Sequence, residues 1–203
     1  MTRMIITRLT RAGLVGMVLC SVTAAFCQTN LFKDGSFEKP VVQPGTYRLF
    51  STEKTFHHWQ VVGDAGSVTL VSGTFTEEGF TFPAKAGVQW LDLTGNSQTA
   101  TGVAQTVTTT PDAAYTLTFY VGNIYDPDGV FGVSSTVNVW VDGQQIYRAT
   151  NSRRTEKAYM VWHKFTTTIM ATSSTTTIAF INGDPPNDTA NGLDKVRLVP
   201  QGD

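Results

Sequence analysis

The stretch Tyr115-Thr116-Leu117-Thr118-Phe119-Tyr120-Val121 decides the fold class, because apolar and polar side chains alternate along it. A two-residue period is typical of a β-strand with one buried face. The pattern predicts that Leu117, Phe119 and Val121 face the core and that Tyr120 points away from it.

The same alternation recurs along the chain, and helical periodicity is hard to find. Turn residues separate the alternating stretches, as at Pro111-Asp112, at the Asp142-Gly143 hairpin signal and in the Pro-containing loop 183–188. The stretch Phe75–Lys85 is expected to form a long loop. We expect seven clear strands and three weaker ones, namely Gly87–Thr94, Gly102–Thr109, Ala114–Gly122, Ser135–Asp142, Met160–Ile169, Thr175–Asn182 and Leu193–Val199, then Thr46–Phe50, Trp59–Val62 and Ser67–Ser72. Such spacing predicts an all-β fold, a β-sandwich or jelly roll.

The N-terminus has the pattern of a secretory signal peptide over residues 1–27. A positive segment carries Arg3, Arg8 and Arg11, and the uncharged run Ala12–Phe26 follows it. That run is too short to span a bilayer, which takes about 20 apolar residues, but it suits an export signal. We expect cleavage before Gln28, with a cut after Ala24 as the alternative.

A lipoprotein signal acylated at Cys20 or Cys27 is disfavoured, because bulky Leu19 and Phe26 precede these cysteines. Both cysteines lie in the expected signal, so the remaining 176 residues, 28–203, form one domain without disulfides. This segment has a net charge of −4 and no basic run beyond Arg153-Arg154, which disfavours nucleic-acid binding. With no second apolar span, we expect a secreted or periplasmic protein, exported by a bacterium.

Three of the expected strands direct a large aromatic ring away from the core, beside polar side chains. These rings are Trp90, Tyr120 and Trp140, and Asp92 and Asn138 lie on the same outward positions. Flat rings complement the CH face of a pyranose, and carboxylates and amides bond its hydroxyls. Three explanations remain open: the Phe75–Lys85 loop covers the rings, the rings bind sugar, or they contact a protein.

The sequence resembles the domain-of-unknown-function 642 family, which includes plant cell-wall proteins and exported bacterial proteins labelled choice-of-anchor C. The resemblance rests on motifs in order along nearly the whole segment after the signal: Asn30–Pro40, His58–Gly63, Ser67–Leu70, Gly87–Gly95, Gly102–Val107 and Gly192–Leu198. It implies a galactose-binding-like jelly roll that attaches to carbohydrate. Trp90 stands where members usually have a small residue, and Asp34 replaces the usual Asn.

The resemblance also implies a structural Ca²⁺ between the first strand and the last. Glu38 and Asp194 occupy the matching positions and Asp34 lies near, and carboxylate oxygens suit Ca²⁺. The alternative is that Glu38 and Asp194 cap loops or pair with Lys39 and Lys195.

Other chemistry is weakly supported. Asp126-Pro127-Asp128-Gly129 lacks the distal Glu of a calcium loop, and His57-His58 has no third metal ligand at a suitable spacing. Glu77-Glu78 has no carboxylate partner placed opposite for glycoside hydrolysis, and nucleophile-elbow and phosphate-loop motifs are absent. Trp59 and Trp162 are expected in the core.

We therefore expect an exported, non-catalytic carbohydrate-binding module, with Trp90, Tyr120 and Trp140 as a stacking platform and Asp92 and Asn138 as hydroxyl partners. Its partner would be a polysaccharide or another glycan. The alternative is an envelope-matrix or protein-interaction module that binds another envelope protein. A glycan-active enzyme is the third and least favoured hypothesis.

Overall fold

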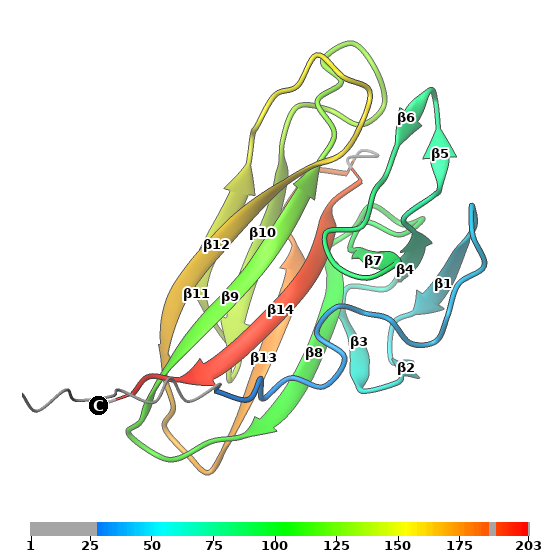
Figure 1. The fold of residues 1–203 in the computed structure, drawn as a ribbon. Helices are drawn as coiled ribbons and strands as arrows, with labels where there is room; N and C mark the ends of the chain where they lie inside the picture. The colour runs from blue at the N-terminus through cyan, green and yellow to red at the C-terminus, as the bar shows by residue number, and fades with distance from the viewer. Residues whose placement is uncertain (1–27, 187–189, 203) are drawn as a thin grey trace, which may run out of the picture.

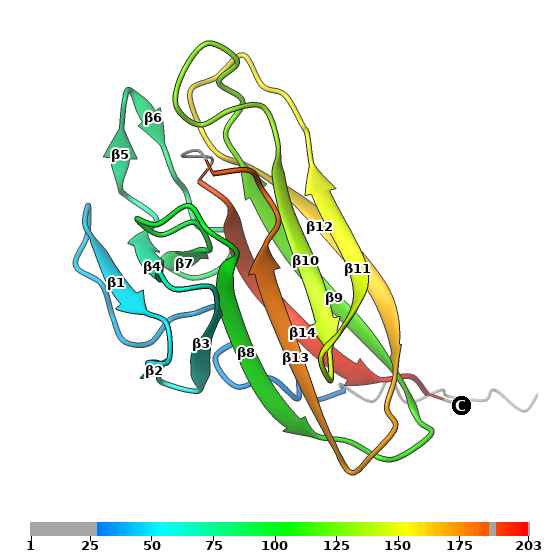
Figure 2. The same cartoon turned by 180° about the vertical axis from the view of Figure 1, so that it is seen from behind.

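Two antiparallel six-stranded sheets face each other in the computed structural model, which describes residues 28–186 and 190–202 (Figures 1 and 2). The expected signal peptide, and residues 187 and 188 of the expected loop, lie outside this part of the chain. The described residues contain no helix, and thus none long and apolar enough to cross a membrane. The prediction of an all-β sandwich is confirmed.

The first sheet, sheet A, has the order β1-β4-β7-β14-β9-β12: Tyr47–Ser51, Ser67–Ser72, Gln89–Asp92, Gly192–Pro200, Ala114–Asn123 and Val161–Met170. The second, sheet B, has the order β11-β10-β13-β8-β3-β2: Gln144–Asn151, Ser135–Val141, Thr175–Asn182, Thr101–Thr108, Trp59–Gly63 and Thr55–Phe56. A small hairpin of β5 (Thr76–Glu77) and β6 (Phe80–Thr81) stands beside sheet A (Figure 1).

The main core lies between the two sheets. Leu117, Phe119 and Val121 of β9 are fully buried there, as the alternation predicted. Trp59 from β3 is also fully buried, and its ring stacks on Phe32 at a centroid distance of 5.3 Å. Each such side chain contributes about 1.5–3 kcal/mol by leaving water, so the inward faces of the strands hold the sandwich together.

The ten expected strands are all present, with ends within two residues of the expected ones. Besides the two-residue strands β2, β5 and β6, the structure adds β11, and the sequence analysis assigned none of these four. Strand β11 is an edge strand with mainly exposed polar side chains, so it lacks the apolar face that marks a strand. The Asp142-Gly143 turn before it does join two strands, with Gly143 at a φ of +83°.

A second apolar cluster lies outside the sandwich, on the outer face of sheet A. The stretch Phe75–Lys85, expected as a loop, contains the β5–β6 hairpin and covers this part of the sheet. The buried members of the cluster are Val71, Phe82, Trp90, Ile124, Phe131, Met160 and Ala190, and Trp162 packs against them. Strands β4 and β7 are therefore buried on both faces.

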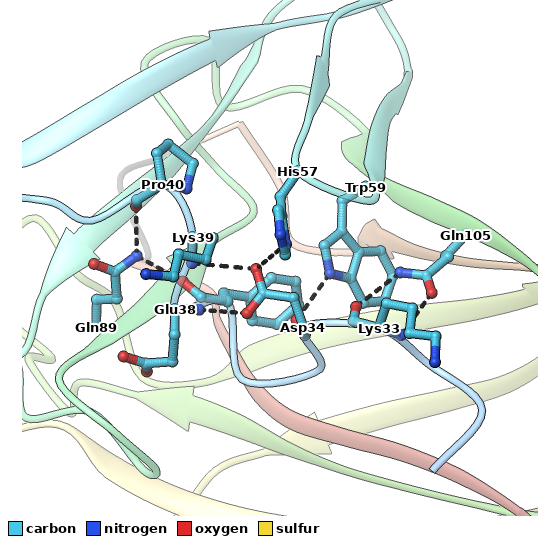
Figure 3. A network of polar contacts seen from close by, with 10 residues as sticks. Lys33, Asp34, Glu38, Lys39, Pro40, His57, Trp59, Gln89 and Gln105 are labelled. Atoms are coloured by element: carbon cyan, nitrogen blue, oxygen red, sulfur yellow. Dashed lines mark hydrogen bonds and ion pairs between the residues drawn. The ribbon is translucent and has the colours of Figure 1, made fainter.

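The loop before β1 is held by one carboxylate, that of Asp34 (Figure 3). Asp34 Oδ1 accepts the Glu38 amide at 2.8 Å, and Oδ2 accepts the Lys39 amide at 3.2 Å and lies 3.1 Å from His57 Nδ1. The Asp34 carbonyl accepts the indole N–H of Trp59 at 3.0 Å. Asp34 thus ties the loop to the core through both its side chain and its backbone.

We predict that Asp34→Ala lowers the free energy of unfolding by about 2 kcal/mol, because two backbone amides and His57 lose a charged acceptor. Asp34→Asn keeps a side-chain oxygen and tolerates the left-handed backbone at φ +52°, so its cost is about half or less. Urea unfolding of both variants measures the difference, and equal costs would contradict this role.

Candidate functional site: a cleft on the outer face of sheet A

A cleft lies over the three strands at the β1 side of sheet A. Strand register aligns two rows of outward side chains across β1, β4 and β7: Tyr47, Val71 and Trp90 in one row, and Leu49, Thr69 and Asp92 in the next. Both rows line a cavity of about 320 Å³. We call it the β1–β7 cleft.

The walls of the β1–β7 cleft come from segments that rise above the sheet. The β5–β6 hairpin and its flanks contribute Phe75, Glu77 and Phe82, and the segment after β7 contributes Gly95, Asn96 and Gln98. Phe131 and Ala190 complete the lining. The volume lies at the lower end of the range of small-molecule sites, about 300–1,000 Å³.

The β1–β7 cleft combines an accessible aromatic ring with polar groups. The side chain of Tyr47 is 55% exposed, and its ring meets Phe75 edge to face at a centroid distance of 5.6 Å. Exposed Asn96 and half-buried Gln98 bring amides, and exposed Glu77 a carboxylate. Such a lining can stack against an apolar ring face while it bonds hydroxyl groups.

Trp90 lies at the base of the β1–β7 cleft, but it is not an open stacking surface. Its side chain is 1% exposed because Phe82 stacks on it at 6.2 Å and Trp162 meets it edge to face at 5.9 Å. The Trp90 indole N–H donates to the Phe82 carbonyl at 3.0 Å. The covering segment is the one named in the sequence analysis, and the hypothesis that Trp90 stacks directly on a ligand is wrong in this structure.

The expected platform of three rings does not form. Trp140 and Asn138 point outward from β10 in sheet B, on the opposite side of the sandwich from Trp90. Tyr120 does point outward from sheet A, but it does not line the β1–β7 cleft. The ammonium groups of Lys85 and Lys195 lie 4.8 and 5.8 Å from the centre of its ring. The chain passes from sheet A to sheet B between β9 and β10, which separates Trp140 from the other two rings, and β14 lies between the strands that carry Trp90 and Tyr120.

Asp92 is the other expected residue that the cleft retains. It is 9% exposed, and its carboxylate accepts the Thr94 hydroxyl at 2.8 Å and the backbone amides of Thr94 and Gly95. These bonds fix the start of the segment that carries Asn96 and Gln98. Asp92 therefore shapes the cleft wall as well as lining it.

Sequence reasoning missed Tyr47, Phe75, Asn96 and Gln98. One face of the expected strand carries Tyr47 and Leu49, and the other carries Arg48 and Phe50. Because each face includes a large apolar side chain, the pattern does not say which face is buried. The other three lie in segments without alternation. Their place in the cleft depends on contacts between distant segments.

The predicted carboxylates Glu38 and Asp194 lie close enough for the charge of Glu38 to affect the ionisation of Asp194. Asp194 is fully buried and accepts the backbone amides of Lys85 at 2.8 Å and Ala86 at 2.9 Å. Burial, and to a smaller degree the charge of Glu38, raises the pKa of Asp194 to about 7 despite these bonds. Burial also raises the pKa of Glu38, whose carboxylate accepts the Val88 amide.

Gly87 allows this arrangement, because a Cβ at that position would lie 2.0 Å from Glu38 Oε1, and its φ is +67°. Burial penalises the charged form of both carboxylates, and the charge of Glu38 adds to the penalty on Asp194. Asp34 does not join them. Its oxygens hold the loop and His57, and no three His, Cys, Asp or Glu side chains of the described chain converge as a metal cluster.

The family comparison now adds to this geometry. The family described as "Protein of unknown function (DUF642)" matches residues 30–198. This chain belongs to the DUF642 family. The match spans both sheets, the hairpin and the β1–β7 cleft. No curated protein sequence matches the chain.

Solved structures with the same fold include an apo cyclase from Fischerella sp., with 17% identity, a TM-score of 0.57 and coverage of 85% of this chain and 95% of that one. A Stig cyclase, Fisc, from Fischerella sp. TAU in complex with an indole compound has 17% identity, a TM-score of 0.56 and coverage of 85% and 96%. At this identity the likeness shows the DUF642 chain's β-sandwich fold alone.

The CBM22-1–CBM22-2 tandem domain of Xyn10C from Paenibacillus barcinonensis is a more distant neighbour. It has 15% identity and a TM-score of 0.49, and the match covers 80% of this chain and 47% of that one. A similarity of this size carries no argument about the ligand.

The burial of Trp90 predicts that Trp90→Ala lowers the free energy of unfolding by about 3–5 kcal/mol, because a cavity opens beneath the hairpin. Trp140→Ala is the matched control, since this ring is only half-buried on sheet B, and its cost is well below that of Trp90→Ala. Urea unfolding followed by circular dichroism gives both values. Similar costs for the two variants would show that the hairpin does not seal Trp90.

Proposed function

We propose that this DUF642 domain is an exported, non-catalytic module that binds carbohydrate in the β1–β7 cleft. The observation that carries the proposal is the cleft itself: a 55% exposed Tyr47 ring, braced by Phe75, beside amide and carboxylate side chains. Sugar rings present an apolar face and a polar rim, and this lining matches both.

The braced ring is suited to stacking. Tyr47 lies on edge strand β1, and the edge-to-face contact with Phe75 fixes its orientation before a ligand arrives. Preorganisation of this kind reduces the entropy that is lost on binding. The amides of Asn96 and Gln98 can each donate to and accept from hydroxyl groups.

We expect weak binding by a single domain. The β1–β7 cleft is open and holds few ligand atoms, so a dissociation constant in the micromolar to millimolar range, about 4–8 kcal/mol, is appropriate. Export through the signal at residues 1–27 would bring the cleft to polysaccharide outside the cytoplasm. The likeness to choice-of-anchor C proteins remains a prediction of the sequence.

We predict that Tyr47→Ala and Gln98→Ala each reduce retention of the protein on insoluble polysaccharide by about tenfold, because each removes a ring or an amide from the cleft. Trp140→Ala on sheet B is the control and leaves retention unchanged. Pull-down on a panel of insoluble polysaccharides, with unfolding curves to confirm folding, gives the comparison.

Equal retention of the wild type and both cleft variants would reject the cleft as the carbohydrate site. Retention on no polysaccharide, together with capture of an envelope protein that Tyr47→Ala abolishes, would favour the protein-interaction or envelope-matrix module. Turnover of a bound glycan would reject the non-catalytic part of the proposal.

A structural Ca²⁺ at Glu38 and Asp194 is a second proposal, supported by two carboxylates whose pKa is raised by burial and, for Asp194, also by the charge of Glu38. Asp34, committed to its loop, is not included. Backbone carbonyls and water would complete the six to eight oxygen ligands that Ca²⁺ takes.

We predict that a hundredfold excess of Ca²⁺ over its dissociation constant raises the melting temperature by roughly 5–10 °C relative to EDTA. Glu38→Gln and Asp194→Asn abolish the Ca²⁺-dependent rise, whereas Asp34→Asn retains it. Differential scanning calorimetry measures all four proteins, and a wild-type melting temperature that is the same in Ca²⁺ and EDTA would reject the site.

A further inference from the structure

A second hollow lies on the other side of strand β1, where the edges of the two sheets meet. Its volume is about 380 Å³, and we call it the β1–β2 pocket. Its lining residues come from the loop before β1, from β1, and from β2 and the turn that follows: Lys39, Pro40, Arg48, Phe50, Thr55, Phe56 and His57.

The β1–β2 pocket is basic within an acidic domain. Lys39, Arg48 and His57 line it and no acidic residue does, although residues 28–203 carry a net charge of −4. Within residues 28–186 and 190–202, His57 forms a close ion pair with Asp34, and neither Lys39 nor Arg48 forms one. Lys39 and Arg48 therefore line the hollow without a close salt bridge, although the charge of Lys39 interacts at longer range with Glu38.

Arg48 occupies a position that strand alternation would give to an apolar residue. Its cross-strand partner is Leu70, which is buried in the main core, so Arg48 lies on the inward side of β1. The side chain is nonetheless exposed, because the sandwich is open at this edge, and its guanidinium lies 5.1 Å from the centre of the Phe50 ring. Stacking on an aromatic ring orients the planar donor group of Arg.

The rest of the β1–β2 pocket is also held in place (Figure 3). Asp34 binds the Lys39 amide and the Nδ1 side of His57, and the Gln89 side chain donates to the Pro40 carbonyl at 3.0 Å. Two acidic groups lie near this pocket's residues: Asp34, whose side chain is 7% exposed and taken up by these bonds, and Glu38, which interacts with the charge of Lys39. The backbone at Lys39 and Pro40 and the ring of His57 are thus fixed at this pocket.

We infer that the β1–β2 pocket is an anion subsite that takes a carboxylate carried on a sugar ring, so that the preferred ligand is an acidic glycan. A guanidinium binds a carboxylate through two parallel hydrogen bonds, and Lys39 adds a point charge. Pro40 and Phe50 offer apolar contact for the ring that bears the carboxylate. The choice of a sugar rests on the proposed function, while the anion specificity rests on the pocket.

The matched probes are D-glucuronate and D-glucose, which share a ring and differ at the carboxylate. Each is titrated into the isotope-labelled protein, purified after export, and followed by amide NMR shifts. We expect glucuronate to shift the amides of Lys39, Arg48 and His57, and glucose to leave them unchanged. Arg48→Gln and Lys39→Gln each weaken glucuronate binding about tenfold, whereas Arg148→Gln, an exposed arginine on the other edge strand β11, does not.

Equal shifts with glucose, or glucuronate binding that survives Arg48→Gln, would overturn the inference. If the protein bound a hexaglutamate peptide more tightly than an oligosaccharide of six uronic-acid units, the preferred ligand would be an acidic protein and not an acidic glycan. An inward charge on an edge strand also guards against edge-to-edge association. Aggregation of Arg48→Gln with unchanged glucuronate affinity of its monomer would assign Arg48 that role instead.

This result is separable from the fate of the β1–β7 cleft. Loss of neutral polysaccharide retention in Tyr47→Ala tests the cleft, and glucuronate shifts test the β1–β2 pocket in the same variant. Retention of the protein on neutral polysaccharide without amide shifts from glucuronate would leave the proposed function intact and reject the anion subsite. Amide shifts from glucuronate without retention on neutral polysaccharide would support the anion subsite and reject the β1–β7 cleft as the carbohydrate site.

Discussion

Burial of strands β4 and β7 on both faces is the constraint on which the rest of the structure depends. All ten residues of these two strands are buried, although a sandwich covers only one face of each sheet. The β5–β6 hairpin supplies the second cover, with Phe82 stacked on Trp90. Because that cover ends before the edge strand β1, it forms one wall of the β1–β7 cleft, and the same apolar contacts that stabilise the sheet define its candidate site.

Much of this fold follows from alternation in the sequence. Each expected strand is present, and Leu117, Phe119 and Val121 face the core as the two-residue period requires. Alternation assigns a side chain to one face of a strand, but it does not say what lies above that face. The outward direction of Trp90 was therefore predictable, whereas its burial under Phe82 depends on a contact between residues that lie in separate segments.

The candidate site was predictable only in part, for a related reason. Asp92 and Trp90 do belong to it, since both lie on the outer face of β7. Trp140 belongs to the other sheet, because β9 and β10 are consecutive in the chain but lie in different layers. Strand order is a property of the whole fold, and no local pattern encodes it. The family resemblance predicted that Glu38 and Asp194 lie close together. The role of Asp34 in holding its loop is visible only in its hydrogen bonds.

Strand β1 is five residues long and pairs with a single neighbour, β4. Its alternate side chains line two hollows: Tyr47 and Leu49 line the β1–β7 cleft, while Arg48 and Phe50 line the β1–β2 pocket. An occupant on either side restrains the same short backbone, so the second occupant loses less conformational entropy than the first. If both surfaces bind, this shared strand would couple the two binding events without a change of shape, and it would favour branched or neighbouring chains that reach both sides of one edge.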